Sequence, residues 1–316
     1  MKRTEQSPLT LAFTAEQPMQ LREFLGMQAL SKRAVTAVKY SGGAITVNGE
    51  ERTVRHMLSA GDRVVIEFPP EDMAAGLTPE DGILEILHED DSLLILDKPA
   101  GQGTIPSRNQ PSGTLANLVA GKYVREGHHA TVHVVTRLDT DTSGLVCIAK
   151  NRHVHHLMSC QMQQTGMDRW YTAFVSGFLN GDEFRIEKPI GRKDGSIIER
   201  DVRPDGQYAR TDVRVTGRFL VDGEPFTAAE LRLYTGRTHQ IRVHMAHIGH
   251  PLIGDDLYGG PCSLLPRQAL HCAAVSFVHP TEHRSVTYTS ALPEDMESLL
   301  AKAVRVQEGN SENFSG

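Results

Sequence analysis

VHVVTRLDTDTSGLVCIA, residues 132–149, places a polar stretch between two apolar runs that have the composition of β-strands. The polar stretch contains Arg137, Asp139, Asp141 and several hydroxyl side chains. Short polar side chains bond to nearby backbone and so favour a tight loop. A loop held between two strands is a good position for a catalytic carboxylate, and Asp139 is our candidate. The same pattern is also typical of an ordinary hydrogen-bonded turn.

A second candidate stretch is RWYTAFVSG, residues 169–177, which follows a helix-like apolar pattern and reads as a strand. Tyr171 lies near the start of this strand, where an aromatic ring can stack on the face of a nucleobase. A tyrosine in a strand is also common in a protein core, so the stretch alone leaves both roles open.

The third stretch is TGRTHQIRVH, residues 235–244. We expect Thr238 to cap a helix that begins near His239, which places Arg242 one turn into the helix. An arginine in that position can hold a carboxylate through its fork of donors. The alternative is a surface arginine in a weak ion pair.

Histidines in and after this stretch raise the question of a metal. His244, His247 and His250 are spaced three apart, but no acidic third ligand stands where the His-Glu-x-x-His pattern has one. Gly249 and Pro251 also indicate that the helix ends near Ile248. We therefore expect no metal site, and a metal-dependent hydrolase built on these histidines is the least favoured hypothesis.

The composition indicates a cytoplasmic, globular protein. The chain has 316 residues, of which 39% are hydrophobic and 23% charged, enough for one large domain and one small one. No apolar run approaches the roughly 18 residues of a membrane span, and the N-terminus lacks the apolar core of a secretory signal. The four cysteines form no Cys-x-x-Cys pair, which argues against zinc or redox chemistry.

The charge of the chain is unevenly distributed. The formal net charge is −6, which on its face argues against a nucleic-acid partner. Residues 71–98 contain nine acidic residues and a single lysine, so this segment carries −8 and the remainder of the chain +2. A basic face elsewhere is therefore compatible with the sequence.

Pro/Gly-rich and acidic stretches divide the chain. We expect a polar leader over 1–18, a small α+β domain over 19–70, an acidic linker over 71–82, a catalytic domain over 83–300 and a flexible tail over 301–316. In the small domain Ser31 is a predicted helix N-cap, and Lys32, Arg33 and Lys39 follow along that helix. In the large domain strands and helices alternate irregularly, which favours an α+β fold over a doubly wound sheet.

Four stretches, in this order along the chain, resemble the RluA-type pseudouridine synthases. They are TRLDTDTSG at 136–144, RWYTAFVSG at 169–177, TGRTHQIRVH at 235–244 and GHPLIGDDLYG at 249–259. The smaller landmarks DKPAG at 97–101 and LHC at 270–272 fit the same family. The resemblance implies a pseudouridine synthase fold, in which a mixed, largely antiparallel sheet is flanked by helices and loops.

The same resemblance assigns roles to individual residues. It places the family's catalytic aspartate on Asp139, its base-stacking tyrosine on Tyr171, and the arginine that pairs with the aspartate on Arg242. Arg137 corresponds to the arginine that occupies the space left by the flipped base. Thr136 and Arg169 replace the usual histidine and lysine, and we expect Arg169 and Arg237 to contact RNA.

The small domain resembles the alpha-L RNA-binding motif of a small-subunit ribosomal protein. The matching pieces are LREFL, SKRAVTAVKYSGGAITVNG and LSAGDRVVI. The resemblance implies that the basic helix carrying Lys32, Arg33 and Lys39 contacts RNA. A small regulatory domain with a solvated basic helix is the alternative.

Taken together, the resemblances predict a monomeric RNA pseudouridine synthase that needs no cofactor or metal and has no membrane partner. Ribosomal RNA is favoured over transfer RNA as the substrate because of the N-terminal domain. The alternative from another class is a non-catalytic RNA-binding or ribosome-assembly factor on the same fold. The presence of Asp139, Tyr171 and Arg242 together argues against that alternative.

Overall fold

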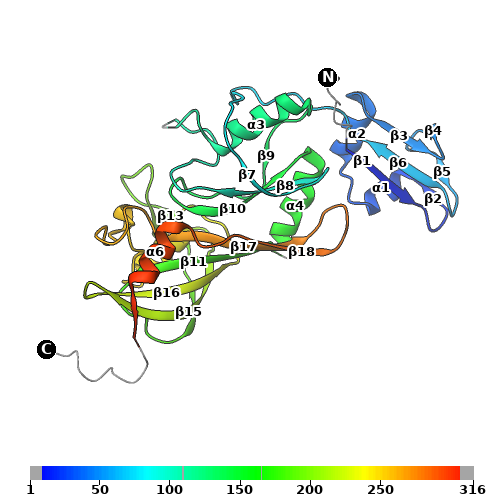
Figure 1. The fold of residues 1–316 in the computed structure, drawn as a ribbon. Coiled ribbons are helices and arrows are strands. Elements are labelled where there is room, and N and C mark those ends of the chain that lie inside the picture. Colours follow the sequence, from blue (N-terminus) through cyan, green and yellow to red (C-terminus); the bar gives the residue numbers. More distant parts are fainter. Residues whose placement is uncertain (1–8, 109, 165, 307–316) are drawn as a thin grey trace.

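The chain builds two main β-sheets, a small one near the N-terminus and a large one in the rest of the molecule (Figure 1). The structure is a computed structural model that describes residues 9–108, 110–164 and 166–306. Within these residues, no helix combines the length and the apolar character that crossing a membrane requires.

The small domain is an antiparallel sheet with two helices. Its elements are β1 (Thr10–Thr14), β2 (Met19–Gln20), α1 (Leu21–Met27), α2 (Lys32–Tyr40), β3 (Ala44–Val47), β4 (Glu50–Glu51), β5 (Met57–Leu58) and β6 (Arg63–Glu67), with the sheet order β1-β6-β3-β4. Leu21, Phe24 and Val38 from the helices pack with Ile45 and Val64 from the sheet. The Ser31 side chain accepts a hydrogen bond from the backbone N–H of Ala34, which confirms the predicted N-cap of α2.

The large domain begins with β7 and ends with β19. Its elements are β7 (Glu85–Glu89), β8 (Leu93–Lys98), α3 (Leu115–Glu126), β9 (His133–Val134), β10 (Ser143–Ala149), α4 (Arg152–Gln164), β11 (Asp168–Ser176), β12 (Glu183–Glu187), β13 (Ile190–Arg192), β14 (Arg200–Val202), β15 (Arg210–Val221), β16 (Glu224–Leu233), α5 (Gln240–His247), the 3₁₀ turn η1 (Asp256–Tyr258), β17 (Leu270–Val278), β18 (Ser285–Thr289), α6 (Glu294–Lys302) and β19 (Val304–Arg305).

The large sheet is mixed but mainly antiparallel, which confirms the predicted α+β fold. Its strand order is β12-β15-β16-β11-β17-β10-β8-β7, with β18, β19 and β9 paired at its sides. The pair β10–β17 is parallel, and the other recorded pairs of this sheet are antiparallel. Every residue of β10 is buried, as are five of the six in β8, so these two strands form the middle of the core.

The ends of the chain differ from the expected boundaries. Residues 10–14 lie in the predicted polar leader, but they form β1 and pair with β6. Every second side chain of β1, Leu11 and Phe13, packs against the core of the small domain. This period-two pattern is hard to recognise in the sequence because polar residues flank it. At the other end, α6 continues to Lys302 and β19 pairs with β15 inside the predicted tail. Residues 1–8 and 307–316 lie outside the described part of the chain.

The acidic segment 71–82 has no helix or strand, but it is fixed against the large domain. Glu71 lies 2.7 Å from the His133 ring and accepts a hydrogen bond from the Arg152 N–H at 2.8 Å. Further along, the Glu80 N–H donates to the Asn117 carbonyl at 3.0 Å. The segment therefore connects the two domains as an irregular stretch that packs against the large domain.

Candidate active site

The three sequence stretches meet at a cleft of about 1040 Å³ in the large domain. The loop between β9 and β10 forms one wall, the first half of β11 forms another, and the β16–α5 connection forms a third. The predicted site residues Arg137, Asp139, Arg169, Tyr171, Arg237 and Arg242 all line this cleft. Lys32, Arg33 and Lys39 do not line it and are exposed on α2.

Asp139 lies on a loop that is held through its backbone. The Thr104 hydroxyl donates to the Leu138 carbonyl at 2.8 Å, and the Leu138 N–H donates back to it at 3.1 Å. The Lys98 ammonium donates to the Thr140 carbonyl at 3.0 Å. These contacts leave the Asp139 side chain, which is 28% exposed, facing the cleft.

Lys98 is a fully buried cation beneath this loop. Besides Thr140, it donates to the carbonyls of Pro99 and Gln102 at 2.9 and 2.7 Å. Burial lowers the pKa of Lys98 to about 8, and the negative charge of nearby Asp139 acts in the opposite direction. In the sequence this lysine stands only within the DKPAG landmark, and no local pattern indicates its contact with the Asp139 loop.

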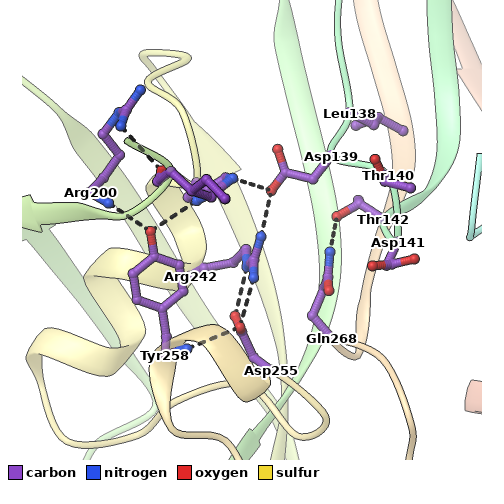
Figure 2. A network of polar contacts seen from close by, with 12 residues as sticks. Leu138, Asp139, Thr140, Asp141, Thr142, Arg200, Arg242, Asp255, Tyr258 and Gln268 are labelled. Carbon is purple, nitrogen blue, oxygen red and sulfur yellow. Dashed lines mark hydrogen bonds and ion pairs between the residues drawn. The ribbon is translucent and has the colours of Figure 1, made fainter. Parts of the chain in front are cut away.

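Arg242 links two carboxylates (Figure 2). Its Nη1 lies 3.3 Å from Asp139 Oδ2, while Nε and Nη2 donate to the two oxygens of Asp255 at 2.7 and 2.8 Å. Asp255 is fully buried and Arg242 nearly so. Burial alone would lower the pKa of Arg242, but the Asp255 hydrogen bonds and the two negative charges raise it, so the guanidinium stays cationic. Asp255 stands in the GHPLIGDDLYG stretch, where no local pattern indicates its contact with Arg242.

The start of α5 differs from the prediction. The helix begins at Gln240, and His239 is its N-cap, in the left-handed conformation with φ of 56° and without a side-chain cap. Thr238 is therefore not the cap, because the left-handed turn shifts the cap by one residue. The Gln240 side chain accepts from the Arg237 N–H at 3.1 Å instead. Arg242 is still in the first turn of the helix and faces the cleft, as predicted.

Tyr258 lies beside Arg242 in the same network of polar contacts (Figure 2), and His239 contacts Tyr258. The Arg200 N–H donates to the Tyr258 hydroxyl at 3.0 Å, and the same hydroxyl lies 2.9 Å from His239 Nδ1. Burial lowers the pKa of His239, which favours the neutral ring. The Nε2 of this ring lies 3.9 Å from Asp139 Oδ2. Neither residue was predicted as part of the site, because each contact joins segments that are distant in the sequence.

Tyr171 and Arg169 point to the same side of β11, because side chains two apart share a face of a strand. Tyr171 is buried, and burial raises the pKa of its phenol well above the ordinary value, so the hydroxyl stays protonated. Arg169 is also buried and donates from Nη2 to the Thr235 carbonyl at 3.2 Å. At the rim, Arg137 is exposed.

Thr136, which replaces the family's histidine, has a local structural contact. Its buried hydroxyl accepts a hydrogen bond from the Cys147 N–H on β10 at 2.9 Å. Thr136 therefore ties the start of the Asp139 loop to the adjacent strand.

The histidines near α5 are occupied by hydrogen bonds. His244 contacts the Thr211 hydroxyl and the Lys188 carbonyl, and His250 contacts the Ser176 carbonyl. In the described part of the chain, one group, His88, Asp90 and His279, brings three potential metal ligands within 4.8 Å of one another. The Glu282 N–H donates to Nδ1 of His279, which leaves the ring proton on Nε2, where it bonds to Asp90. This group is satisfied as a hydrogen-bonded cluster.

Comparisons with known proteins agree with this geometry. A family model described as RNA pseudouridylate synthase matches residues 92–247. The chain is 43% identical over 282 residues to the uncharacterized RNA pseudouridine synthase YjbO of Bacillus subtilis (strain 168), covering 89% of this chain and 98% of that protein. It is 35% identical over 275 residues to ribosomal large subunit pseudouridine synthase D of Xanthomonas campestris, covering 83% and 81%.

A solved structure shares the fold. Human RNA Pseudouridylate Synthase Domain Containing 1 aligns with a TM-score of 0.58 at 24% identity, over 72% of this chain and 91% of that one.

Proposed function

Since this chain belongs to the RluA-type family of RNA pseudouridine synthases, and is therefore an isomerase, we propose that Asp139 is its catalytic carboxylate and ribosomal RNA its substrate. The observation that supports the catalytic assignment is the contact between Asp139 and Arg242 in a cleft that Tyr171 also lines. The other carboxylates of the cleft, Asp141 and Asp256, are exposed.

The reaction requires access to a nucleotide that is normally stacked. The target uridine must leave its stack and enter the cleft, as for other enzymes that act on a base. Asp139 then acts on the sugar, by attack at C1′ or by removal of the proton at C2′. Both routes need a carboxylate at the same place beside the sugar, so one assignment serves either route.

The bond changes are balanced without a redox partner. The N1–C1′ bond breaks and its electron pair stays on the uracil. The uracil turns, C5 forms a bond to C1′, the C5 proton is lost to a base, and N1 takes up a proton. The buried Arg242 holds the Asp139 carboxylate in place before the substrate arrives, so that little reorganisation is needed during the reaction.

Tyr171 and Arg137 are assigned to the base and to the RNA helix, respectively. Tyr171 is at the cleft wall and its ring packs against the flipped uracil. Arg137 is at the exposed rim, where a long cationic side chain fills the space that the base has left. Arg237, fixed by a hydrogen bond from Nε to the Tyr208 carbonyl at 3.0 Å, is placed to contact the RNA backbone.

Ribosomal RNA is the favoured substrate for two reasons. Several relatives that are 32–35% identical carry the name ribosomal large subunit pseudouridine synthase D. The small domain, moreover, presents Lys32, Arg33 and Lys39 at an exposed helix surface, where cations can contact phosphates.

The test uses the purified full chain with three RNAs freed of protein: large-subunit ribosomal RNA, small-subunit ribosomal RNA and bulk transfer RNA. All three come from cells that lack the gene. Pseudouridine is then mapped by mass spectrometry. We expect new pseudouridine at defined positions of the large-subunit RNA. Modification of transfer RNA alone would contradict the substrate assignment, and binding of all three RNAs without modification would favour the non-catalytic RNA-binding alternative.

A further inference from the structure

Arg169 is a buried cation without a buried anion. It is 9% exposed, and in the described part of the chain no carboxylate forms an ion pair with it. Its Nη2 donates to the Thr235 carbonyl, but its buried Nε has no hydrogen-bond partner. A buried charge without a counter-charge costs free energy, so such a group calls for a ligand that supplies the missing negative charge.

The position of the guanidinium is fixed next to Tyr171. Both residues line the cleft from the same face of β11. On the other side of Arg169, a Cβ added to Gly236 would lie 2.8 Å from Nη1, so the guanidinium is in contact with the Thr235–Gly236 turn. The strand and the turn together hold this cation where Tyr171 meets the base.

We propose that Arg169 is a catalytic residue that stabilises the negative charge which develops on the uracil when its bond to the sugar breaks. This inference rests on the proposed function of the cleft. When the N1–C1′ bond breaks, its electron pair remains on the uracil, and the charge spreads from N1 to the carbonyl oxygens O2 and O4. A guanidinium placed beforehand beside the ring lowers the energy of this state without reorganisation. When the C5–C1′ bond forms, the charge disappears.

An RNA phosphate is the other anion that could meet Arg169. The burial of Arg169 favours the uracil, because the flipped base enters the cleft. A backbone phosphate is esterified to two nucleotides and therefore stays at the mouth of the cleft. The two sources differ in what they affect. Stabilisation of the uracil changes the rate of bond cleavage and depends on the acidity of the leaving base, whereas a phosphate contact changes RNA affinity.

The test compares uridine with 5-fluorouridine at the target position of one RNA, under single-turnover conditions. Fluorine withdraws electrons and makes the uracil a better leaving group. Cleavage of its bond to the sugar therefore depends less on stabilisation by Arg169. We expect Arg169→Gln to slow conversion of the uridine RNA about 100-fold, and to slow consumption of the 5-fluorouridine RNA by about tenfold or less. Arg169→Lys, which keeps the charge, should stay within about tenfold of the wild type on both.

Controls separate this inference from the proposed function and from misfolding. Turnover of uridine RNA by the wild type checks the proposed function by itself. Arg232→Gln removes an arginine from the adjacent strand, where it pairs with Asp168, and should leave the rate unchanged. Arg169→Met, which fills the buried volume without charge, repeats the measurement if the glutamine variant unfolds.

Three results would overturn the role of Arg169. They are a wild-type rate for the folded uncharged variants, an equal defect on the two substrates, and a loss of RNA affinity with an unchanged rate at saturation.

Discussion

Asp255 is fully buried and both of its carboxylate oxygens bond to Arg242, at 2.7 and 2.8 Å, whereas the Asp139 carboxylate is 28% exposed and meets Arg242 once, at 3.3 Å. The two aspartates share one arginine, but they are held differently. The Asp255 carboxylate is itself the structural contact. The Asp139 loop is held through backbone groups by Thr104 and Lys98, which leaves its carboxylate available.

The difference indicates how a carboxylate can be held in position while its oxygens remain available to a substrate. A carboxylate that makes two short ion-paired hydrogen bonds in the interior has little capacity left for a substrate. Under the proposed function, Asp255 orients Arg242 and Arg242 in turn orients Asp139, so we expect Asp255 to act as a positioning residue. Substitutions on the two sides of Arg242 should therefore separate effects on turnover from effects on stability.

The largest expected effect on turnover comes from Asp139→Asn. Single-turnover conversion of the target RNA should fall at least about 10,000-fold, as expected for loss of a group that takes part in the chemistry. The free energy of unfolding should change by about 0.5 kcal/mol or less, because asparagine keeps a side-chain oxygen that can accept from Arg242 and Asp255 still supplies the buried counter-charge. Denaturant titration of the same protein samples gives the stability. A large loss of stability would place Asp139 with Asp255 as a structural residue.

Arg242→Met should lower both the turnover rate and the free energy of unfolding. The change leaves the Asp255 carboxylate buried without its donors, which costs about 3–5 kcal/mol of stability. It also removes the cation next to Asp139, and turnover should fall about 1,000-fold. Arg242→Lys is the matched control, since it keeps the charge but cannot form the two-point contact. The lysine variant should lie between wild type and methionine in both measurements, and equal stability of all three would contradict the proposed link.

Asp255→Asn should act on turnover only through Arg242. Loss of the charge weakens the hold on the guanidinium, so we expect turnover to fall about 100-fold through misplacement of Arg242, and stability to fall by about 2–3 kcal/mol. RNA affinity should stay unchanged, because Asp255 is fully buried. A loss of turnover as large as that of Asp139→Asn, without a loss of stability, would contradict the distinction between a structural Asp255 and a catalytic Asp139.

Thr104→Val should give the smallest effect. It leaves the buried N–H and carbonyl of Leu138 without their hydroxyl partner, at a cost of about 1–3 kcal/mol. Turnover should fall by about tenfold, because the loop no longer fixes the carboxylate as closely. Thr104→Ser restores the hydroxyl and should restore both values. Full activity of the valine variant would show that the backbone contacts do not determine where Asp139 lies.

Much of this site could be predicted from the sequence because its parts follow local patterns. The loop of Asp139 stands between two apolar strands, Tyr171 lies in a strand, and Arg242 lies in the first turn of a helix. Each position depends on a few neighbouring residues, and the order of the motifs supplied the remaining information. The α+β fold followed in the same way, from the irregular alternation of strands and helices.

The residues that were missed depend on contacts between distant segments. Asp255 meets Arg242 only because the chain turns back after α5, and Lys98 reaches the Asp139 loop from β8, 42 residues away from its acceptor Thr140. No local pattern marks either contact. The cap of α5 was misplaced because the left-handed conformation of His239 has no signature in its side chain, and β1 was missed because its alternation is short and flanked by polar residues.

The most direct test of the central claim is a complementation experiment in cells that lack the gene. Ribosomal RNA is isolated after expression of the wild type, Asp139→Asn or Asp255→Asn at matched protein levels, and pseudouridine is mapped at each position. We predict that the wild type restores the missing pseudouridines, that Asp255→Asn restores them in part, and that Asp139→Asn restores none. Full restoration by Asp139→Asn would contradict the assignment of Asp139 as the catalytic carboxylate.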